Sequence, residues 1–153
     1  MATVEPEGLA PVNTAPQWET VELAVDSGAS ETVIPTGLLR GVSLQPSDAS
    51  RRGVTYQVAN GQEIPALGEK HVYGSTHSEG YGRSITAQVC NVRKPLMSVH
   101  KLVTAGHRVV FDEPGAYIEN KTTKERIQLQ ESGGMYVLKL WVHSSGKGTD
   151  AGF

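Results

Sequence analysis

Asp26 stands where an apolar segment runs into a turn of small residues, and its carboxylate could do chemistry there. Val25 precedes it, and Ser27, Gly28 and Ala29 follow it. Ser27 supplies a hydroxyl, Gly28 lets another backbone approach closely, and Ala29 leaves space beside the carboxylate. A carboxylate held in such a turn can bind a water molecule and act first as a general base and then as a general acid. The turn is therefore a candidate site for activating water.

The same tripeptide has a purely structural interpretation. Asp-Ser-Gly is a common turn sequence, because Asp and Ser both favour Asx-type turns. The wider context favours a buried loop, since apolar residues flank the turn on both sides. A solvent-exposed hairpin turn would not need Val25 before it and Ala29 after it.

Residues 24–30, Ala-Val-Asp-Ser-Gly-Ala-Ser, resemble the active-site motif of retropepsin-type aspartic proteases. That motif has two apolar residues followed by Asp-Ser/Thr-Gly-Ala. Residues 58–65, followed by Gly68, resemble the flap hairpin of retrotransposon proteases. Residues 96–102, 106–111 and 134–138 are similar to segments of copia-type polyproteins. The resemblance covers residues 21–142 and implies a retropepsin-like small closed barrel with a flap hairpin and one short helix.

The resemblance also implies roles for individual residues. Asp26 would be catalytic, and Ser27 would bond across a dimer to its counterpart. Gly28 would hydrogen-bond the substrate backbone through its carbonyl, while Ala29 and Val33 would lie near the substrate cleft. The flap that closes over an extended peptide would consist of Ala59, Asn60, Gly61 and Gln62. As an alternative, 58–65 could form an ordinary surface hairpin.

The presence of a single Asp-Ser-Gly motif in the chain predicts that two chains together form the active site. The aspartic protease reaction needs two carboxylates that share one proton. The chain has four Asp residues, and the motif contains only one of them. Asp48 and Asp112 lie in segments typical of turns, and Asp150 lies near the C-terminus. The second carboxylate must therefore come from a symmetry mate, which predicts a twofold homodimer.

One feature departs from the family pattern. Many retropepsins have two apolar residues and a Gly before their helix, whereas this chain has Leu96-Met97-Ser98. Copia-type chains share this departure. The segment therefore supports an assignment within the family, close to the copia-type proteases.

Composition excludes several other classes of function. The 153 residues carry a formal net charge of −2, which gives no basic surplus for a nucleic-acid partner. The one cysteine, Cys90, excludes an intrachain disulfide and a multi-cysteine zinc site. The five histidines lack metal-motif spacing. We expect no metal, no cofactor, no signal peptide and no membrane span, and an intracellular location, cytoplasmic or within a retroelement particle.

Short apolar runs separated by turn signals predict an all-β domain over residues 17–143, with flexible tails over 1–16 and 144–153. Residues 31–35 should return antiparallel to a first strand over 20–25. Asn60-Gly61 predicts a hairpin between 55–59 and 62–67. One helix is expected over 96–105, and 38–44 could hold a short helical turn. The other expected strands cover 71–73, 84–92, 108–111, 116–119, 126–129 and 135–142.

Three hypotheses follow from the sequence. The first is a homodimeric aspartic endopeptidase that processes polyproteins. The second is a catalytically silent binding or dimerisation module with the retropepsin fold, derived from a retroelement. The third is a structural β-domain in which the Asp26 motif is coincidental. Intact Asp26-Ser27-Gly28 favours the first over the second.

Overall fold

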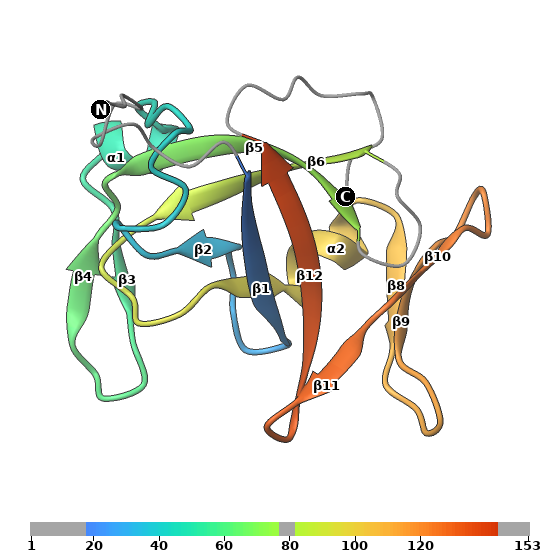
Figure 1. The fold of residues 1–153 in the computed structure, drawn as a ribbon. Helices are drawn as coiled ribbons and strands as arrows, with labels where there is room; N and C mark the ends of the chain where they lie inside the picture. The colour runs from blue at the N-terminus through green and yellow to red at the C-terminus, as the bar shows by residue number, and fades with distance from the viewer. Residues whose placement is uncertain (1–17, 77–81, 144–153) are drawn as a thin grey trace, which may run out of the picture.

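The computed structural model describes residues 18–76 and 82–143 (Figure 1). The tails expected over 1–16 and 144–153 lie outside these ranges. Within them the chain forms twelve β-strands and two short helices, so the expectation of an all-β fold is confirmed. Neither described helix has the length and apolar character needed to cross a membrane.

Seven strands form the main sheet. They are β1 (Trp18–Asp26), β2 (Val33–Ile34), β5 (Gly68–Thr76), β6 (Gly82–Val89), β7 (Leu96–Ser98), β11 (Gln130–Ser132) and β12 (Met135–His143). Their order is β1-β7-β2-β6-β5-β12-β11, and β12 also pairs with β1. The pairings of six strands therefore return to β1 in a closed circuit. The sequence analysis did not anticipate β11, and it predicted only part of β5.

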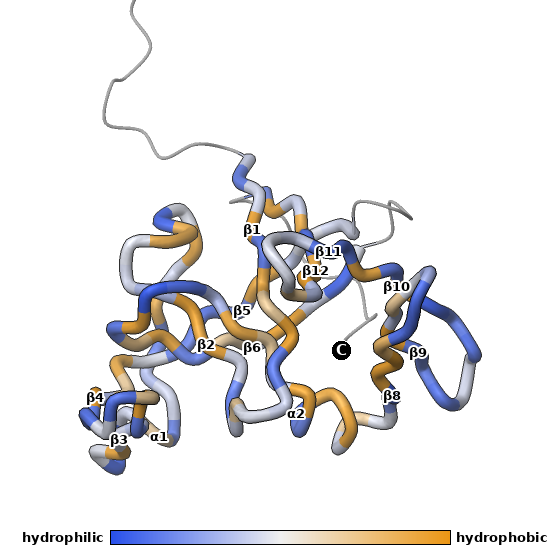
Figure 2. The backbone as a smooth tube through the Cα atoms, turned by 90° about the horizontal axis from the view of Figure 1, so that it is seen from below, coloured by the Kyte–Doolittle hydropathy of each residue, from blue (hydrophilic) through white to orange (hydrophobic). Residues whose placement is uncertain are grey.

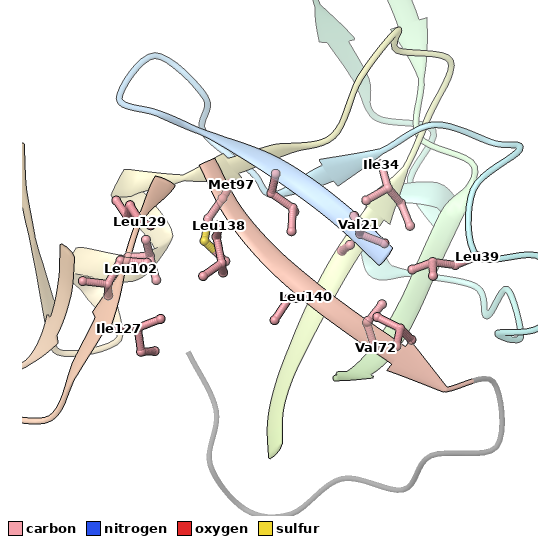
Figure 3. Packing of buried hydrophobic residues seen from close by; sticks show 14 of the residues in the cluster. Val21, Ile34, Leu39, Val72, Met97, Leu102, Ile127, Leu129, Leu138 and Leu140 are labelled. Atoms are coloured by element: carbon pink, nitrogen blue, oxygen red, sulfur yellow. The ribbon is translucent and has the colours of Figure 1, made fainter. Parts of the chain in front are cut away.

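The core lies against this sheet and extends from it to Leu102, Ile127 and Leu129 (Figure 3). Strand β1 alternates buried and exposed positions, and Leu23 pairs in register with Leu138 of β12. Both side chains are buried, as are Val21, Leu140 and Met97. Burying a side chain of this size contributes roughly 1.5–3 kcal/mol, which makes this cluster the main support of the sheet. Figure 2 shows hydrophobic residues along the central strands and largely hydrophilic residues in the peripheral turns.

The strand predicted after the Asp26 turn is present as β2, but the expectation that it pairs with β1 is wrong. Strand β2 pairs in parallel with β6 and antiparallel with β7, while β7 pairs in parallel with β1. β7 thus lies between β1 and β2. The connection over 27–32 is longer than a tight hairpin turn, so β1 and β2 can separate by two strand spacings. The fully buried Met97 fills the place between them.

Two smaller sheets lie beside the main one. The predicted hairpin is present, with β3 (Thr55–Gln57) antiparallel to β4 (Glu63–Pro65). The third sheet has the order β10-β9-β8, from β8 (His107–Val110), β9 (Tyr117–Asn120) and β10 (Arg126–Gln128). Figure 1 shows these two sheets on opposite sides of the main sheet.

The helices differ from the expectation of a single one. Helix α1 (Asp48–Arg51) begins after Ser47, which forms a reciprocal capping box with Ser50. Helix α2 (Val99–Thr104) is shorter than predicted, because residues 96–98 pair with β1 as strand β7. No helix forms over 38–44, where Leu39 takes a positive φ of 56°. For residues 96–98, pairing with β1 and β2 therefore outweighed the helical spacing of their apolar side chains.

Candidate active site

Asp26 is the last residue of β1, and the turn that follows holds its side chain in place. The Gly28 amide donates a hydrogen bond to Asp26 Oδ1 at 2.7 Å. A β-carbon at position 28 would lie 3.3 Å from the same oxygen, closer than such contacts normally come. Glycine at position 28 therefore lets the backbone amide approach Asp26 Oδ1 closely. The Gly28 amide does not bind the other carboxylate oxygen, Oδ2.

Ser98 supports the turn from β7. It pairs in register with Asp26, and its side chain is fully buried. Its hydroxyl donates to the Ala29 carbonyl at 2.6 Å, and its amide donates to Thr32 Oγ1 at 3.1 Å. The same hydroxyl accepts the Lys101 amide at 3.1 Å, so it also caps α2. Ser98 thereby links the Asp26 turn, β7 and the helix.

The sequence analysis missed this role. It named Ser98 only as part of the Leu96-Met97-Ser98 segment that departs from the family pattern. One signal was present, because a serine directly before a helical stretch favours an N-cap. No local sequence pattern predicts the hydrogen bond between Ser98 and Ala29, since the two residues are far apart along the chain.

A cavity of about 420 Å³ lies between the Asp26 turn and the β3–β4 hairpin. The turn contributes Asp26, Gly28, Ala29, Ser30 and Glu31. The hairpin contributes Tyr56, Gln57, Val58 and Ala59, and the floor consists of Val33, Cys90, Val92 and Leu96. Two carboxylates, Asp26 and Glu31, therefore border a largely apolar cleft.

The predicted site residues divide into two groups. Asp26, Gly28 and Ala29 line this cavity, as does Ala59 of the predicted flap. The other three flap residues, Asn60, Gly61 and Gln62, are exposed at the hairpin tip. Ser27 is also exposed and does not border this cavity.

Two groups lining the cavity remain protonated at neutral pH. Burial raises the pKa of the Cys90 thiol, which is fully enclosed. Burial also raises the pKa of the Tyr56 hydroxyl, and the nearby Glu31 carboxylate adds to the effect. A neutral, buried thiol is a poor nucleophile, so the cavity does not favour a cysteine mechanism.

Glu31 is a second carboxylate beside the cavity, and the sequence analysis did not single it out. Its side chain forms an ion pair with Lys101 of α2 at 3.1 Å. The pair is partly exposed and contributes little to stability. It does engage Glu31 with a cation, so Asp26 has no free acidic partner among the other lining residues.

In the described ranges, no three His, Cys, Asp or Glu side chains gather in a way that could hold a metal ion. Comparisons of the chain with protein-family models, curated proteins and solved structures gave no match. The interpretation of this site therefore depends on its residues and their geometry. These are one oriented carboxylate, an apolar cleft and a hairpin beside it.

Proposed function

We propose that this chain is an aspartic endopeptidase of the retropepsin type, closest to copia-type retrotransposon proteases, which hydrolyses peptide bonds as a homodimer. The observation that carries the proposal is the position of Asp26. It lies at a strand end, oriented by the Gly28 amide, at the edge of a cavity flanked by a hairpin. These are the elements that peptide hydrolysis by a carboxylate requires: a general base, room for a substrate, and a hairpin that can exclude water.

The arrangement of strands supports the same proposal. The circuit of pairings from β1 through β7, β2, β6, β5 and β12 back to β1 suits a small closed barrel. The β3–β4 hairpin extends from that circuit beside Asp26, where a flap would act. We therefore assign the hairpin tip, Ala59 to Gln62, to closing over bound peptide.

The proposed chemistry uses Asp26 from each of two chains. The two carboxylates share one proton, because like charges about 3 Å apart do not both ionise. The ionised one takes a proton from water as the water oxygen attacks the scissile carbonyl carbon. The protonated one donates a hydrogen bond to the carbonyl oxygen. A proton then passes to the amide nitrogen as the carbon–nitrogen bond breaks.

The cavity also bears on the substrate. Its floor of Val33, Cys90, Val92 and Leu96 suits an apolar side chain of an extended peptide. The peptide backbone would lie across the Asp26 turn and under the hairpin, adding main-chain hydrogen bonds. The proposed substrate is therefore an extended polyprotein segment with an apolar residue near the cleaved bond.

Hydrolysis of a peptide library by the purified chain tests the proposal. We expect cleavage that pepstatin-like inhibitors block, and a loss of about 10²–10⁴-fold in Asp26→Asn, which is nearly isosteric but cannot accept the proton of water. Asp48→Asn is the matched control, because Asp48 is exposed and borders neither cavity next to Asp26. Equal activity in Asp26→Asn would refute the assignment. No hydrolysis by the wild-type dimer would favour a catalytically silent module instead.

A further inference from the structure

Asp26 borders a second cavity, of about 430 Å³, that shares only Asp26 and Leu96 with the first. Its remaining lining comes from the end of β1, the segment before β7, the residue after β8 and the start of β12, namely Ala24, Val25, Ser27, Lys94, Phe111, Gly134, Met135 and Tyr136. Figure 1 shows the turn after β1 between the β3–β4 hairpin and the β11–β12 turn. Ser27 lines this second cavity and does not line the cleft between the Asp26 turn and the hairpin.

Large apolar side chains are exposed around this cavity. Phe111 is 46% exposed and Met135 is 37% exposed. The Phe111 ring packs on Tyr136, with 5.2 Å between ring centroids. Aromatic residues and methionine are enriched in protein interfaces, and contiguous exposed patches of this kind mark interaction sites. We call Phe111, Met135 and Tyr136, together with Ser27, the Phe111 face.

Charges of both signs flank the Phe111 face and form no ion pairs within the described ranges. Lys94 Nζ lies 3.2 Å from the Met135 sulfur, and Asp112 and Glu113 directly follow Phe111. All three residues are exposed. In the described part of the chain, none of them forms an ion pair. In a twofold contact, residue i of one copy meets residue j of the other and the reverse, so Lys94 could pair with the acidic residues twice.

We propose that the Phe111 face binds a second copy of this chain, with Lys94 of one copy against Asp112 and Glu113 of the other. The inference depends on the proposed function in one respect, because the shared-proton mechanism needs a second Asp26 beside the first. Of the two cavities that Asp26 borders in the described ranges, the second has Ser27, Lys94 and the exposed Phe111 and Met135 in its lining. The acidic residues Asp112 and Glu113 directly follow Phe111 in the chain. A second copy seated there brings the two Asp26 turns together while the cleft under the hairpin stays open to peptide.

Sedimentation equilibrium of the full chain over a concentration series tests the inference. We expect a monomer–dimer equilibrium whose dissociation constant rises at least about tenfold in Phe111→Asp and in Met135→Asp, because a charge would be buried at the centre of the contact. Val103→Asp is the matched control. Val103 is 49% exposed on α2 and lines neither cavity next to Asp26. Circular dichroism verifies that each variant is folded.

Charge-reversal variants provide a second, independent test of the proposed dimer contact. Lys94→Glu alone should weaken the dimer, as should the pair Asp112→Lys and Glu113→Lys. The triple variant should dimerise more tightly than either parent, because every repulsive contact becomes attractive again. This recovery cannot come from a general loss of folding.

The outcomes separate this inference from the proposed function. A dimer unaffected by the Phe111, Met135 and charge variants overturns the inference, whether or not the chain cleaves peptides. A wild-type chain that stays monomeric at all concentrations also overturns it. A dimer that depends on this face supports the inference, and if that dimer hydrolyses no peptide, only the proposed function fails.

Discussion

The hydroxyl of Ser98 donates a 2.6 Å hydrogen bond to the carbonyl oxygen of Ala29, a residue 69 positions earlier in the chain. The same oxygen atom of Ser98 accepts the Lys101 amide. One buried side chain thus fixes both the turn that follows Asp26 and the start of α2. The geometry of the candidate site therefore depends on β7 as much as on the Asp26 motif itself.

Replacing Ser98 by Ala should destabilise the protein and reduce its proposed activity together. The change leaves the Lys101 amide without its cap and the Ala29 carbonyl without a donor, at a cost of about 1–3 kcal/mol. Urea unfolding measures the stability, and peptide hydrolysis under folding conditions measures the activity. Ser43→Ala, at an exposed serine, is the control. Equal unfolding free energies in the two variants would contradict the role of Ser98.

Replacing Gly61 by Ala should weaken the β3–β4 hairpin. Gly61 has a φ of +85°, a conformation that costs other residues about 1–2 kcal/mol. We expect faster amide hydrogen exchange in the hairpin and a rise of several-fold in the KM for peptide substrates. Gly37→Ala is the matched control, because Gly37 is exposed and its added β-carbon would meet no atom within 4 Å. An unchanged KM in Gly61→Ala would argue against a flap.

The proposed activity should depend on dimer concentration. Each chain has one Asp26 motif, so specific activity should fall as the protein is diluted below its dissociation constant. Adding excess Asp26→Asn chain to the wild type should also inhibit it, because mixed dimers contain only one carboxylate. The Asp48→Asn chain should not inhibit. Constant specific activity on dilution would contradict a shared site.

His107 should make stability decrease at mildly acidic pH. Burial lowers the pKa of this imidazole, the Arg83 charge lowers it further, and a hydrogen bond with the Leu102 backbone partly opposes both. Below the ordinary histidine pKa of about 6.5, the unfolded chain therefore binds a proton that the folded chain does not. Stability is fully present above this pH and falls as pH decreases, by at most about 1.4 kcal/mol per pH unit for one proton.

Urea unfolding of the wild type and of His107→Gln, at several pH values between 7.5 and 5.5, measures this contribution. The variant should show the smaller loss of stability on acidification, because its side chain does not titrate in this range. Parallel pH curves for the two proteins would show that His107 does not couple protonation to folding.

Local signals in the sequence were sufficient for some parts of this protein. Alternating apolar residues predicted most strands, because one face of each strand is buried. Asn60-Gly61 predicted the hairpin, because glycine adopts the positive φ that the turn requires. The small residues after Asp26 predicted a turn that approaches the carboxylate, and the Gly28 amide does so.

Which strands become neighbours depends on contacts that form only in the folded chain. The apolar pattern of 96–103 suits a helix and a strand alike, and pairing with β1 and β2 made Leu96–Ser98 a strand. The Ser98–Ala29 bond, the pairing of β1 with β12 and the lining of both cavities join distant segments in the same way. Apolar faces and turns could be predicted from the sequence, since both depend on residues that are close together along the chain. Contacts between distant segments depend on how the whole chain packs, so they were settled only in the folded protein.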